Sequence, residues 1–529
     1  MEGHTCGQYR QTVSALEPLP DLRLPHPAQA APVELASQTP ALPIYWQLTL
    51  KRLIDLAVVS VLFFTPAYLC LRSSAIFDTD FGWHLRTGEW ITAHHAIPHT
   101  EPFSAPIAGA PWAAYSWLFE LLNYQLFHHL GTLGLLVYTA ALLLLITTAV
   151  FALVRSNRQH LPAAAMLAFA CMYAMGHLFT PRPWLFSILF FTLELHILQR
   201  VRRTGSTRPL LWLPLLFAVW ANIHIQFVYG LFILGLALLE SLASSRFKEI
   251  TTRAAWRPLA ATLLCASLAT LVNPYGPRVY SVALGFATQS GALDTIGELQ
   301  AIPFRDLMHY EALLFALASA GVLGWQRRWL SFEGALLFFA AFVSFRSQRD
   351  AWVIAIAGAA ILSQALPRTA APDLRTTSSA DRIAKYLAPA AFAIVVCLLA
   401  LAFRSPDLSE SQLRERQATQ LPVGAVDFIR THGYSGPIFN DFNWGGYLIW
   451  NLHQPVTIDG RQNVYGDQRI QRSVATWSGA PGWQSDPDLR SAHLVIGPAG
   501  AVLTQLLRSD PGFQLAYQDK VAAVFVARP

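Results

Sequence analysis

Two carboxylates, Asp78 and Asp80, stand one residue apart in the sharpest local motif of the sequence. From a non-helical turn both can reach one centre, where they could hold a divalent cation such as Mg²⁺ or Mn²⁺ through oxygen ligands. One of them could instead accept the proton of an attacking hydroxyl. The alternative is an acidic turn that caps a helix beginning near Gly82, because Asp is a preferred N-cap residue. His84 and Arg86 follow in the same phrase and are candidates for binding a substrate.

Arginines are the second chemical signal. A guanidinium is a planar, permanently charged fork that matches the oxygens of a phosphate. We expect four arginines to share one cavity and to bind a donor phosphate there: Arg182, Arg278, Arg346 and Arg349. The alternative is that some of them anchor the chain at lipid headgroups. Glu101 and His224 are further candidates for substrate binding.

The composition indicates what must position these side chains. Of the 529 residues, 53% are hydrophobic and 13% are charged, whereas about 25% is usual for charged residues in a soluble protein. Apolar runs of roughly 20 residues, enough to cross a bilayer, recur along the chain. They predict a polytopic α-helical membrane protein with about eleven transmembrane helices, at 53–71, 132–154, 161–179, 183–200, 210–224, 226–243, 258–274, 309–325, 331–345, 350–367 and 384–403.

Basic residues occupy every second loop between these runs. Arg155 and Arg158 separate the second and third runs, and Arg202 and Arg203 separate the fourth and fifth. Because basic loops stay in the cytoplasm, this alternation predicts a cytoplasmic N-terminus and an outer C-terminus. The net charge of +6 is spread over these loops, so it indicates topology and not a nucleic-acid partner.

Three regions follow from this topology. Residues 1–48 are expected to form a disordered cytoplasmic tail, 49–403 the transmembrane domain, and 404–529 an extracytoplasmic α/β domain. The first outer loop, 72–131, carries two amphipathic stretches that suit interfacial helices, at 82–95 and 116–130. In the last region, alternating short apolar runs predict strands at 438–440, 456–459, 493–496 and 521–526, and helices at 424–431 and 503–508.

The C-terminal region has polar candidates of its own. Asp441, Asn443, Trp444 and the turn from Asp459 to Arg461 could bind an acceptor. The alternative, which we favour, is a folded cap in which Asp459 and Arg461 form an ion pair that stabilises a turn.

Two strings of the sequence resemble segments of the GT-C superfamily of membrane glycosyltransferases. The first runs from Asp78 through Trp90 to Glu101-Pro102-Phe103-Ser104 and Pro111-Trp112, and the second runs from Asn440 to Tyr465. The closest groups are bacterial proteins related to the protein mannosyltransferases and the lipid A aminoarabinose transferases. These motifs cover only about 72–117 and 421–466, while the predicted topology of the whole chain resembles that of the superfamily.

The resemblance implies a reaction and a place for it. A sugar would pass from a polyprenyl-phosphate donor to a glycan, lipid or protein acceptor, at the outer face of a bacterial inner membrane. An acidic residue of the first outer loop would assist the acceptor, here Asp78 or Asp80, with Asp78 ranked slightly first. Outer arginines would hold the donor phosphate, and some members use a divalent metal while others do not.

Two other functions remain open from the sequence alone. A transporter of lipid-linked saccharides would also need outward arginines, but it favours charges in the middle of the membrane, where this chain is apolar. A non-catalytic scaffold with the same fold would tolerate replacement of Asp78 and Asp80 by Asn.

Overall fold

The computed structural model describes residues 44–72, 78–157, 159–246, 255–289, 291, 296–368, parts of 389–404, and 407–528. The expected tail lies outside these residues except for 44–48, which already belong to the first helix. The last predicted span, 384–403, also falls largely outside them.

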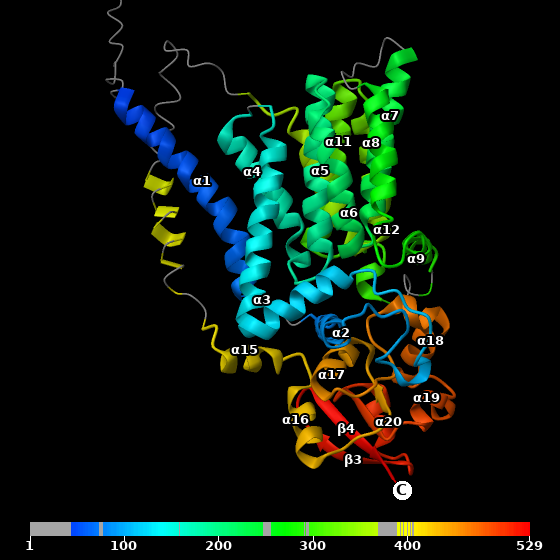
Figure 1. The fold of residues 1–529 in the computed structure, drawn as a ribbon. Helices are drawn as coiled ribbons and strands as arrows, with labels where there is room; N and C mark the ends of the chain where they lie inside the picture. The colour runs from blue at the N-terminus through cyan, green and yellow to red at the C-terminus, as the bar shows by residue number, and fades with distance from the viewer. Residues whose placement is uncertain are drawn as a thin grey trace, which may run out of the picture.

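A bundle of apolar helices forms the first part of the described chain, and a small α/β domain forms the last part (Figure 1). The long helices of the bundle are α1 (Ile44–Arg72), α3 (Trp117–Val154), α4 (Leu161–Ala174), α5 (Trp184–Thr204), α6 (Leu213–Ile223), α7 (Phe227–Arg246), α8 (Trp256–Ala269), α11 (Leu307–Trp325), α12 (Phe332–Arg346) and α13 (Ala351–Leu362). Short elements at its ends are η3 (Gly176–Leu178), η4 (Arg208–Trp212), α9 (Arg278–Thr288), η5 (Gly297–Leu299) and η6 (Gln348–Asp350).

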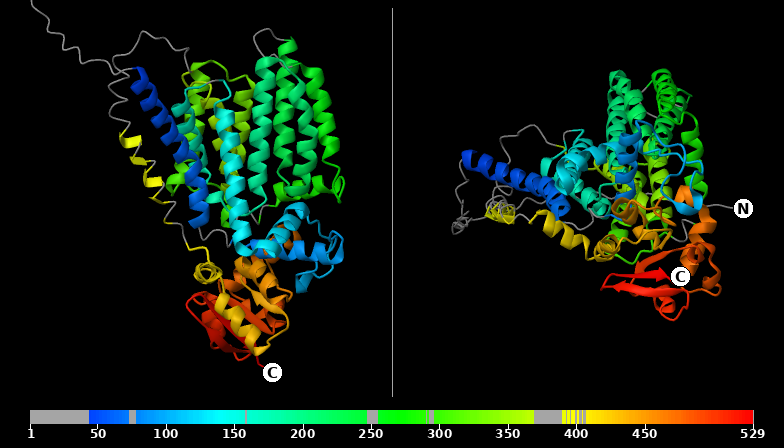
Figure 2. Two further views of the ribbon diagram at one scale, coloured as in Figure 1. Left: turned by 60° about the vertical axis from the view of Figure 1, so that its left-hand side comes forward. Right: turned by 60° about the horizontal axis from the view of Figure 1, so that its bottom comes forward.

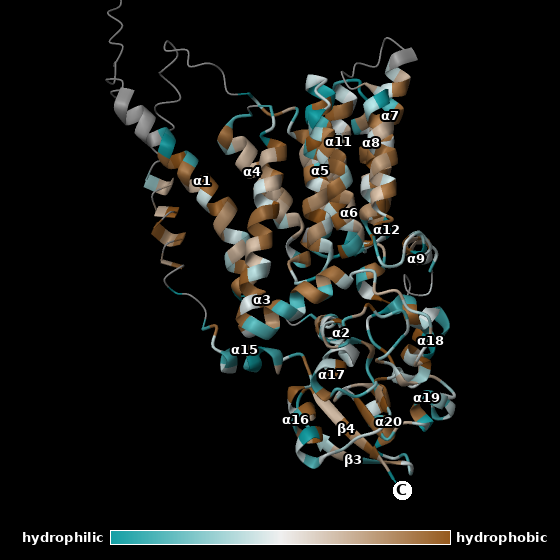
Figure 3. Ribbon diagram, in the orientation of Figure 1, coloured by the Kyte–Doolittle hydropathy of each residue, from teal (hydrophilic) through white to brown (hydrophobic). Residues whose placement is uncertain are grey.

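Each of the first ten predicted spans falls on one of these helices. Four helices of the described chain, α1, α3, α5 and α7, are long and apolar enough to cross a membrane. The apolar helices at Leu161–Ala174 and Arg208–Ile223 are shorter, so the count of about eleven spans remains a prediction. Figure 3 shows the bundle mainly in hydrophobic colours, with hydrophilic residues at its ends, as expected for a membrane protein.

Helices occupy both stretches of the first outer loop where interfacial helices were predicted. The first is α2 (Phe81–His94), and the second is the beginning of α3, which bends at Gly131 (φ 61°) before it enters the bundle. A positive φ costs glycine little, so this residue allows the chain to turn from one direction into the other. Between the two helices lies η2 (Ala105–Ile107).

The C-terminal domain is built on one mixed sheet of four strands in the order β1-β2-β4-β3. The strands are β1 (Ile438–Asn440), β2 (Leu494–Pro498), β3 (Phe513–Gln518) and β4 (Ala522–Ala527), with β1 parallel to β2 and the other pairs antiparallel. Around them lie α15 (Glu410–Gln417), α16 (Val423–His432), η7 (Phe442–Trp444), α17 (Gly445–Leu452), α18 (Gln462–Trp477), η8 (Trp483–Ser485), α19 (Pro487–Arg490) and α20 (Val502–Leu507).

Beyond one isolated parallel bridge from Val456 to Ile438 of β1, the predicted strand 456–459 does not form, and β3 was not predicted. Val456 instead bonds to the first outer loop: its N–H donates to the Phe103 carbonyl and its carbonyl accepts from the Ala105 N–H, both at 3.0 Å. This segment therefore joins the loop to β1 at the edge of the sheet.

Close packing joins α2 to the C-terminal domain. A Cβ at Gly82 would lie 2.2 Å from the Gly446 carbonyl oxygen, so α2 and α17 meet where both lack side chains. Trp83 and Trp112 share a buried core with Leu448 of α17. Figure 2 shows α2 and the first outer loop between the bundle and the domain, so a site at this level receives residues from all three.

Candidate active site

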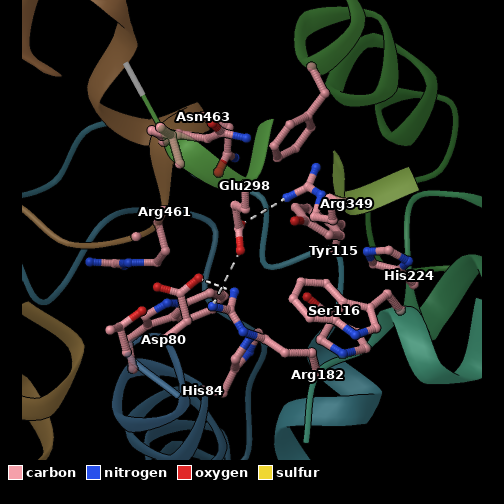
Figure 4. A pocket seen from close by; sticks show the side chains of 18 of the residues that line it. Asp80, His84, Tyr115, Ser116, Arg182, His224, Glu298, Arg349, Arg461 and Asn463 are labelled. Carbon is pink, nitrogen blue, oxygen red and sulfur yellow. Dashed lines mark hydrogen bonds and ion pairs between the residues drawn. The ribbon is translucent and has the colours of Figure 1, made fainter. Parts of the chain in front are cut away.

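The two carboxylates of the first outer loop converge on one arginine. Arg182, directly before α5, forms ion pairs with both Asp78 and Asp80. Glu298 of η5 also approaches this guanidinium, and the distance from its Oε2 to Nη2 of Arg182 is 4.0 Å. Only 7% of Arg182 is exposed. Segments from three separate parts of the sequence therefore meet at a buried charge cluster (Figure 4).

Asp80 does not act as a helix cap, although it occupies the N-cap position of α2. Its side chain accepts no hydrogen bond from the first turn. Asp78 makes the local turn instead: its Oδ1 accepts from the backbone N–H of Asp80 at 3.0 Å. The side chain of Asp80 is thus directed to Arg182 and the cavity.

The charges at this centre are shifted by burial and by each other. Burial raises the pKa of Asp80 to about 6, against the opposing effect of the Arg182 guanidinium. The neighbouring carboxylates of Asp78 and Glu298 add to the rise. The pKa of Arg182 is raised because these carboxylates outweigh its own burial. A carboxyl with a pKa near the working pH is suited to accept and release a proton.

The expected divalent cation would have to compete with an arginine. Asp78, Asp80 and Glu298 are the oxygen donors present, but Arg182 already takes the position between them. Among the described residues, no group of three or more His, Cys, Asp or Glu is arranged to hold a metal ion. In this arrangement the Arg182 guanidinium supplies the positive charge between the carboxylates.

A cavity of about 330 Å³ opens beside the cluster. Its polar lining combines residues from the outer loop, the bundle and the C-terminal domain: Asp80, His84, Tyr115, Ser116, Glu120, Arg182, His224, Glu298, Arg349, Asn443, Arg461, Gln462 and Asn463. Figure 4 shows Asp80 and Arg349 on opposite sides of it. Such a mixture of polar donors and aromatic walls is typical of a substrate pocket.

Arg349 connects this cavity to a second one. It lies 3.6 Å from Glu298, measured from Nη1 to Oε1, and it lines both cavities together with Phe286. The second cavity, about 170 Å³, also contains Arg346 and apolar residues of α7, α9 and α12. Two of the expected phosphate-binding arginines therefore lie where polar and apolar surfaces meet.

The turn of the C-terminal domain covers Asp80 from the other side. Arg461 pairs with Asp459, with 2.8 Å from Nε to Oδ1, and with Glu101, with 2.5 Å from Nη1 to Oε2. The ion pair expected for a folded cap is present, and Glu101 joins it as a structural partner. A Cβ at Gly460 would lie 1.7 Å from Oδ1 of Asp80, so the turn rests directly on that carboxylate.

The remaining candidates divide between the cavity and the surface. His84 and His224 line the cavity; Nδ1 of His84 lies 3.4 Å from Glu120, and Nδ1 of His224 lies 2.8 Å from the Ser187 hydroxyl. Burial holds the pKa of His84 well below its usual value, so its ring is neutral.

Two candidates lie elsewhere. Arg86 pairs with Glu89 on the outer side of α2, because the helical turn directs it away from His84. Arg278 is exposed at the start of α9 and lines neither of these two cavities. The four arginines therefore do not share one cavity: Arg182 lines the first, Arg346 the second, and Arg349 both.

Sequence reasoning did not identify Glu298, Glu120 or Asn463. Glu298 lies between the predicted spans 258–274 and 309–325, far along the chain from Asp80, and only the fold brings the two together. Its expected outer position was the one available signal.

No protein-family model and no curated protein matches this chain. Solved structures do. The archaeal oligosaccharyltransferase AglB from Archaeoglobus fulgidus, in complex with an inhibitory peptide and a dolichol-phosphate, has a TM-score of 0.49 and 13% identity over 86% of this chain and 69% of that chain. ArnT from Cupriavidus metallidurans, bound to undecaprenyl phosphate, has a TM-score of 0.46 and 13% identity over 89% of this chain and 99% of that chain.

Both structures are members of the GT-C superfamily, the class that the sequence motifs resemble. At 13% identity and TM-scores below 0.5, the likeness carries no residue's role from those proteins to this chain.

Proposed function

We propose that this chain is a membrane glycosyltransferase that moves a sugar from a polyprenyl-phosphate donor to a glycan, lipid or protein acceptor. The observation that carries the proposal is the cavity with Asp80 on one side and Arg349 on the other. Transfer from a phosphate needs a proton acceptor for the incoming hydroxyl and a positive charge for the leaving group. This cavity offers both.

Asp80 is the proposed proton acceptor. The acceptor oxygen attacks the anomeric carbon, its proton passes to the Asp80 carboxylate, and the bond between that carbon and the phosphate oxygen breaks with its electrons on the phosphate. Arg182 holds Asp80 in place through their ion pair. We rank Asp80 above Asp78, contrary to the ranking from the sequence, because Asp80 lines the cavity and Asp78 forms the turn behind it.

Arg349 and Arg346 are proposed to hold the phosphate of the donor. Their cavity has apolar walls from Val228, Ala283 and Val343, which suit the first isoprene units of a lipid. A phosphate leaving group needs little protonation, so a single displacement with inversion fits a site with one facing carboxylate.

The C-terminal domain is proposed to receive the acceptor, because Asn443, Gln462 and Asn463 line the same cavity. With the topology expected from the basic loops, this domain and the cavity lie on the outer face of a bacterial inner membrane. Released polyprenyl phosphate would then leave into the lipid layer beside α7 and α12.

The test is transfer of radiolabelled sugar from a panel of polyprenyl-phosphate sugars in membranes that contain the full chain. We expect Asp80→Asn to lower transfer on the order of 10²- to 10⁴-fold, the usual size of a general-base contribution. Asp427→Asn is the matched control, because Asp427 is an exposed carboxylate of α16 in a surface ion pair. Equal transfer by Asp80→Asn and wild type would show that Asp80 takes no part in the chemistry. Movement of the lipid-linked sugar across the vesicle membrane without sugar transfer would indicate a transporter.

A further inference from the structure

A polar cavity lies at the opposite end of the bundle from the candidate active site. Its volume is about 370 Å³, within the range of roughly 300–1,000 Å³ of small-molecule sites. Every residue that lines it is polar: Ser156, Asn157, Gln159, Gln199, Arg202, Arg203, Gln326, Arg328, Glu333, Ser363, Gln364 and Arg368. Five of these are amides and four are arginines, so the cavity is rich in hydrogen-bond donors.

The one carboxylate of this lining is already occupied. Glu333 accepts from Arg202 at 2.6 Å (Nη1 to Oε1) and from Arg328 at 3.0 Å (Nη2 to Oε2). Arg202 is also held from behind by Glu240, at 2.6 Å and 2.7 Å. This network fixes one wall of the cavity. Both of its carboxylates are already paired, so neither is available to Arg203 or Arg368.

Arg203 and Arg368 face the cavity without an acidic partner among the described residues. Arg203 donates only to main-chain carbonyls, those of Gln199 at 3.2 Å and Ser156 at 3.0 Å. Arg368 approaches the Asn157 amide, whose oxygen can accept from its Nε at 3.0 Å. Four arginines against Glu333 and Glu240 give an excess of two positive charges around a partly enclosed space.

Topology alone does not explain this arrangement. The positive-inside bias requires basic residues in a loop, and an exposed one such as Arg200 satisfies it. Here buried amides and hydroxyls, Gln199 at 6% exposure and Ser363 at 1%, converge on the same space as the arginines. Two guanidinium groups without an acidic partner match the oxygens and the charge of a phosphate.

We propose that this cavity binds a phosphate group, carried by an anionic lipid headgroup or by a soluble phosphate compound. The site is separate from the active site, because Arg182 and Arg202 lie at the two ends of the 21-residue α5. A helix of that length spans about 30 Å, the thickness of the hydrocarbon core of a bilayer. The cavity therefore opens at the level of the opposite headgroup layer, the cytoplasmic one in the expected topology.

The experiment measures binding of ³²P-labelled inorganic phosphate to the full chain in nanodiscs of neutral phosphatidylcholine. A second arm measures the midpoint of thermal unfolding in nanodiscs with and without phosphatidylglycerol. The variant is Arg203→Gln combined with Arg368→Gln, and Arg200→Gln on the same helix is the matched control. Loss of two charge-assisted hydrogen bonds should weaken binding by at least about tenfold.

The two arms separate the sources of the phosphate. If the wild type binds phosphate in neutral nanodiscs and the double variant does not, the ligand is a soluble compound. If only phosphatidylglycerol raises the midpoint of thermal unfolding, and this rise is absent in the double variant, the ligand is a lipid headgroup. Neither effect in the wild type, or an equal loss in Arg200→Gln, would overturn the proposal and leave the arginines as topology signals. The proposed transferase activity does not enter either readout.

Discussion

At the residue scale, the two acidic residues of the first outer loop are not equivalent. Asp78 accepts the Asp80 N–H and so shapes the turn, while Asp80 lies under Gly460 and faces the cavity. Both pair with Arg182, but only Asp80 also lines the cavity. The difference comes from the turn and not from the residue type, so Asn at the two positions should have different effects.

The pKa of Asp80 leads to a prediction for the pH dependence of transfer. The carboxylate accepts a proton only when ionised, so kcat/KM should rise with pH and reach half its plateau near pH 6, the pKa of this group. The donor phosphate is a diester and lacks the second ionisation, near pKa 6, of a monoester. Initial rates from about pH 5 to pH 8 measure the profile of the free enzyme. A flat profile over that range would contradict the role of Asp80.

Sequence reasoning identified the residues of this centre that lie in one short motif. Asp78, Asp80 and His84 could be recognised because spacing along the chain is visible in the sequence. Glu298 and the contact of Gly460 with Asp80 could not, because each depends on chain segments hundreds of residues apart meeting in space. Arg182 was identified by its charge on the expected outer side, but its partners were not.

At the element scale, glycines set the position of α2. Gly82 meets Gly446 of α17, and Gly460 meets the Asp80 carboxylate at the N-terminus of α2. The C-terminal domain therefore packs directly against α2, and Asp80, the proposed base, lies at the start of this helix. Arg461 fixes the turn that contains Gly460. It forms ion pairs with Glu101 and Asp459 and lies against the aromatic rings of Trp83 and Trp112.

Substituting Gly460 tests whether this turn positions Asp80. A Cβ would lie 1.7 Å from Oδ1 of Asp80, so Gly460→Ala must displace the carboxylate. We expect kcat to fall on the order of 10²-fold, the cost of a displacement near 1 Å, with the KM for the donor near that of wild type. In the Asp80→Asn background the same substitution should add little, because both act through one carboxylate.

Gly500→Ala is the control for this experiment, because a Cβ at Gly500 meets nothing within 4 Å. A raised donor KM with unchanged kcat in Gly460→Ala would show that the turn contacts the donor instead. Equal losses in the two variants would indicate general destabilisation of the domain.

The elements themselves were predicted unevenly, for physical reasons. Helices with a clear apolar run, such as α5 and α7, were found to within a few residues. Strand β3 was missed because its faces alternate weakly, and 456–459 was mistaken for a strand because its apolar residues pair with the outer loop. Periodicity reports burial, and it does not say which partner buries a segment.

At the scale of the whole molecule, arginines lie at both ends of the bundle, and only some of them pair with carboxylates. Near the C-terminal domain, Arg182, Arg349 and Arg461 each pair with at least one carboxylate. At the other end, Arg202 and Arg328 also pair with a carboxylate, whereas Arg203 and Arg368 have none among the described residues. Ion pairing therefore reconciles outer arginines with the positive-inside bias, because a neutralised arginine adds little to the charge of its side.

This distribution predicts the orientation of the chain. The end that carries the basic loops should face the cytoplasm, and the C-terminal domain should lie outside. Alkaline phosphatase, which is active only outside, fused after residue 528 should be active, whereas its fusion in the loop after Gly205 should be inactive. A fluorescent protein that folds only in the cytoplasm should give the opposite pattern at the same two positions. The reverse result would place the cavity of Asp80 in the cytoplasm, where the proposed lipid donor would have to be presented from the inner leaflet. It would also place the second proposed phosphate site at the outer leaflet.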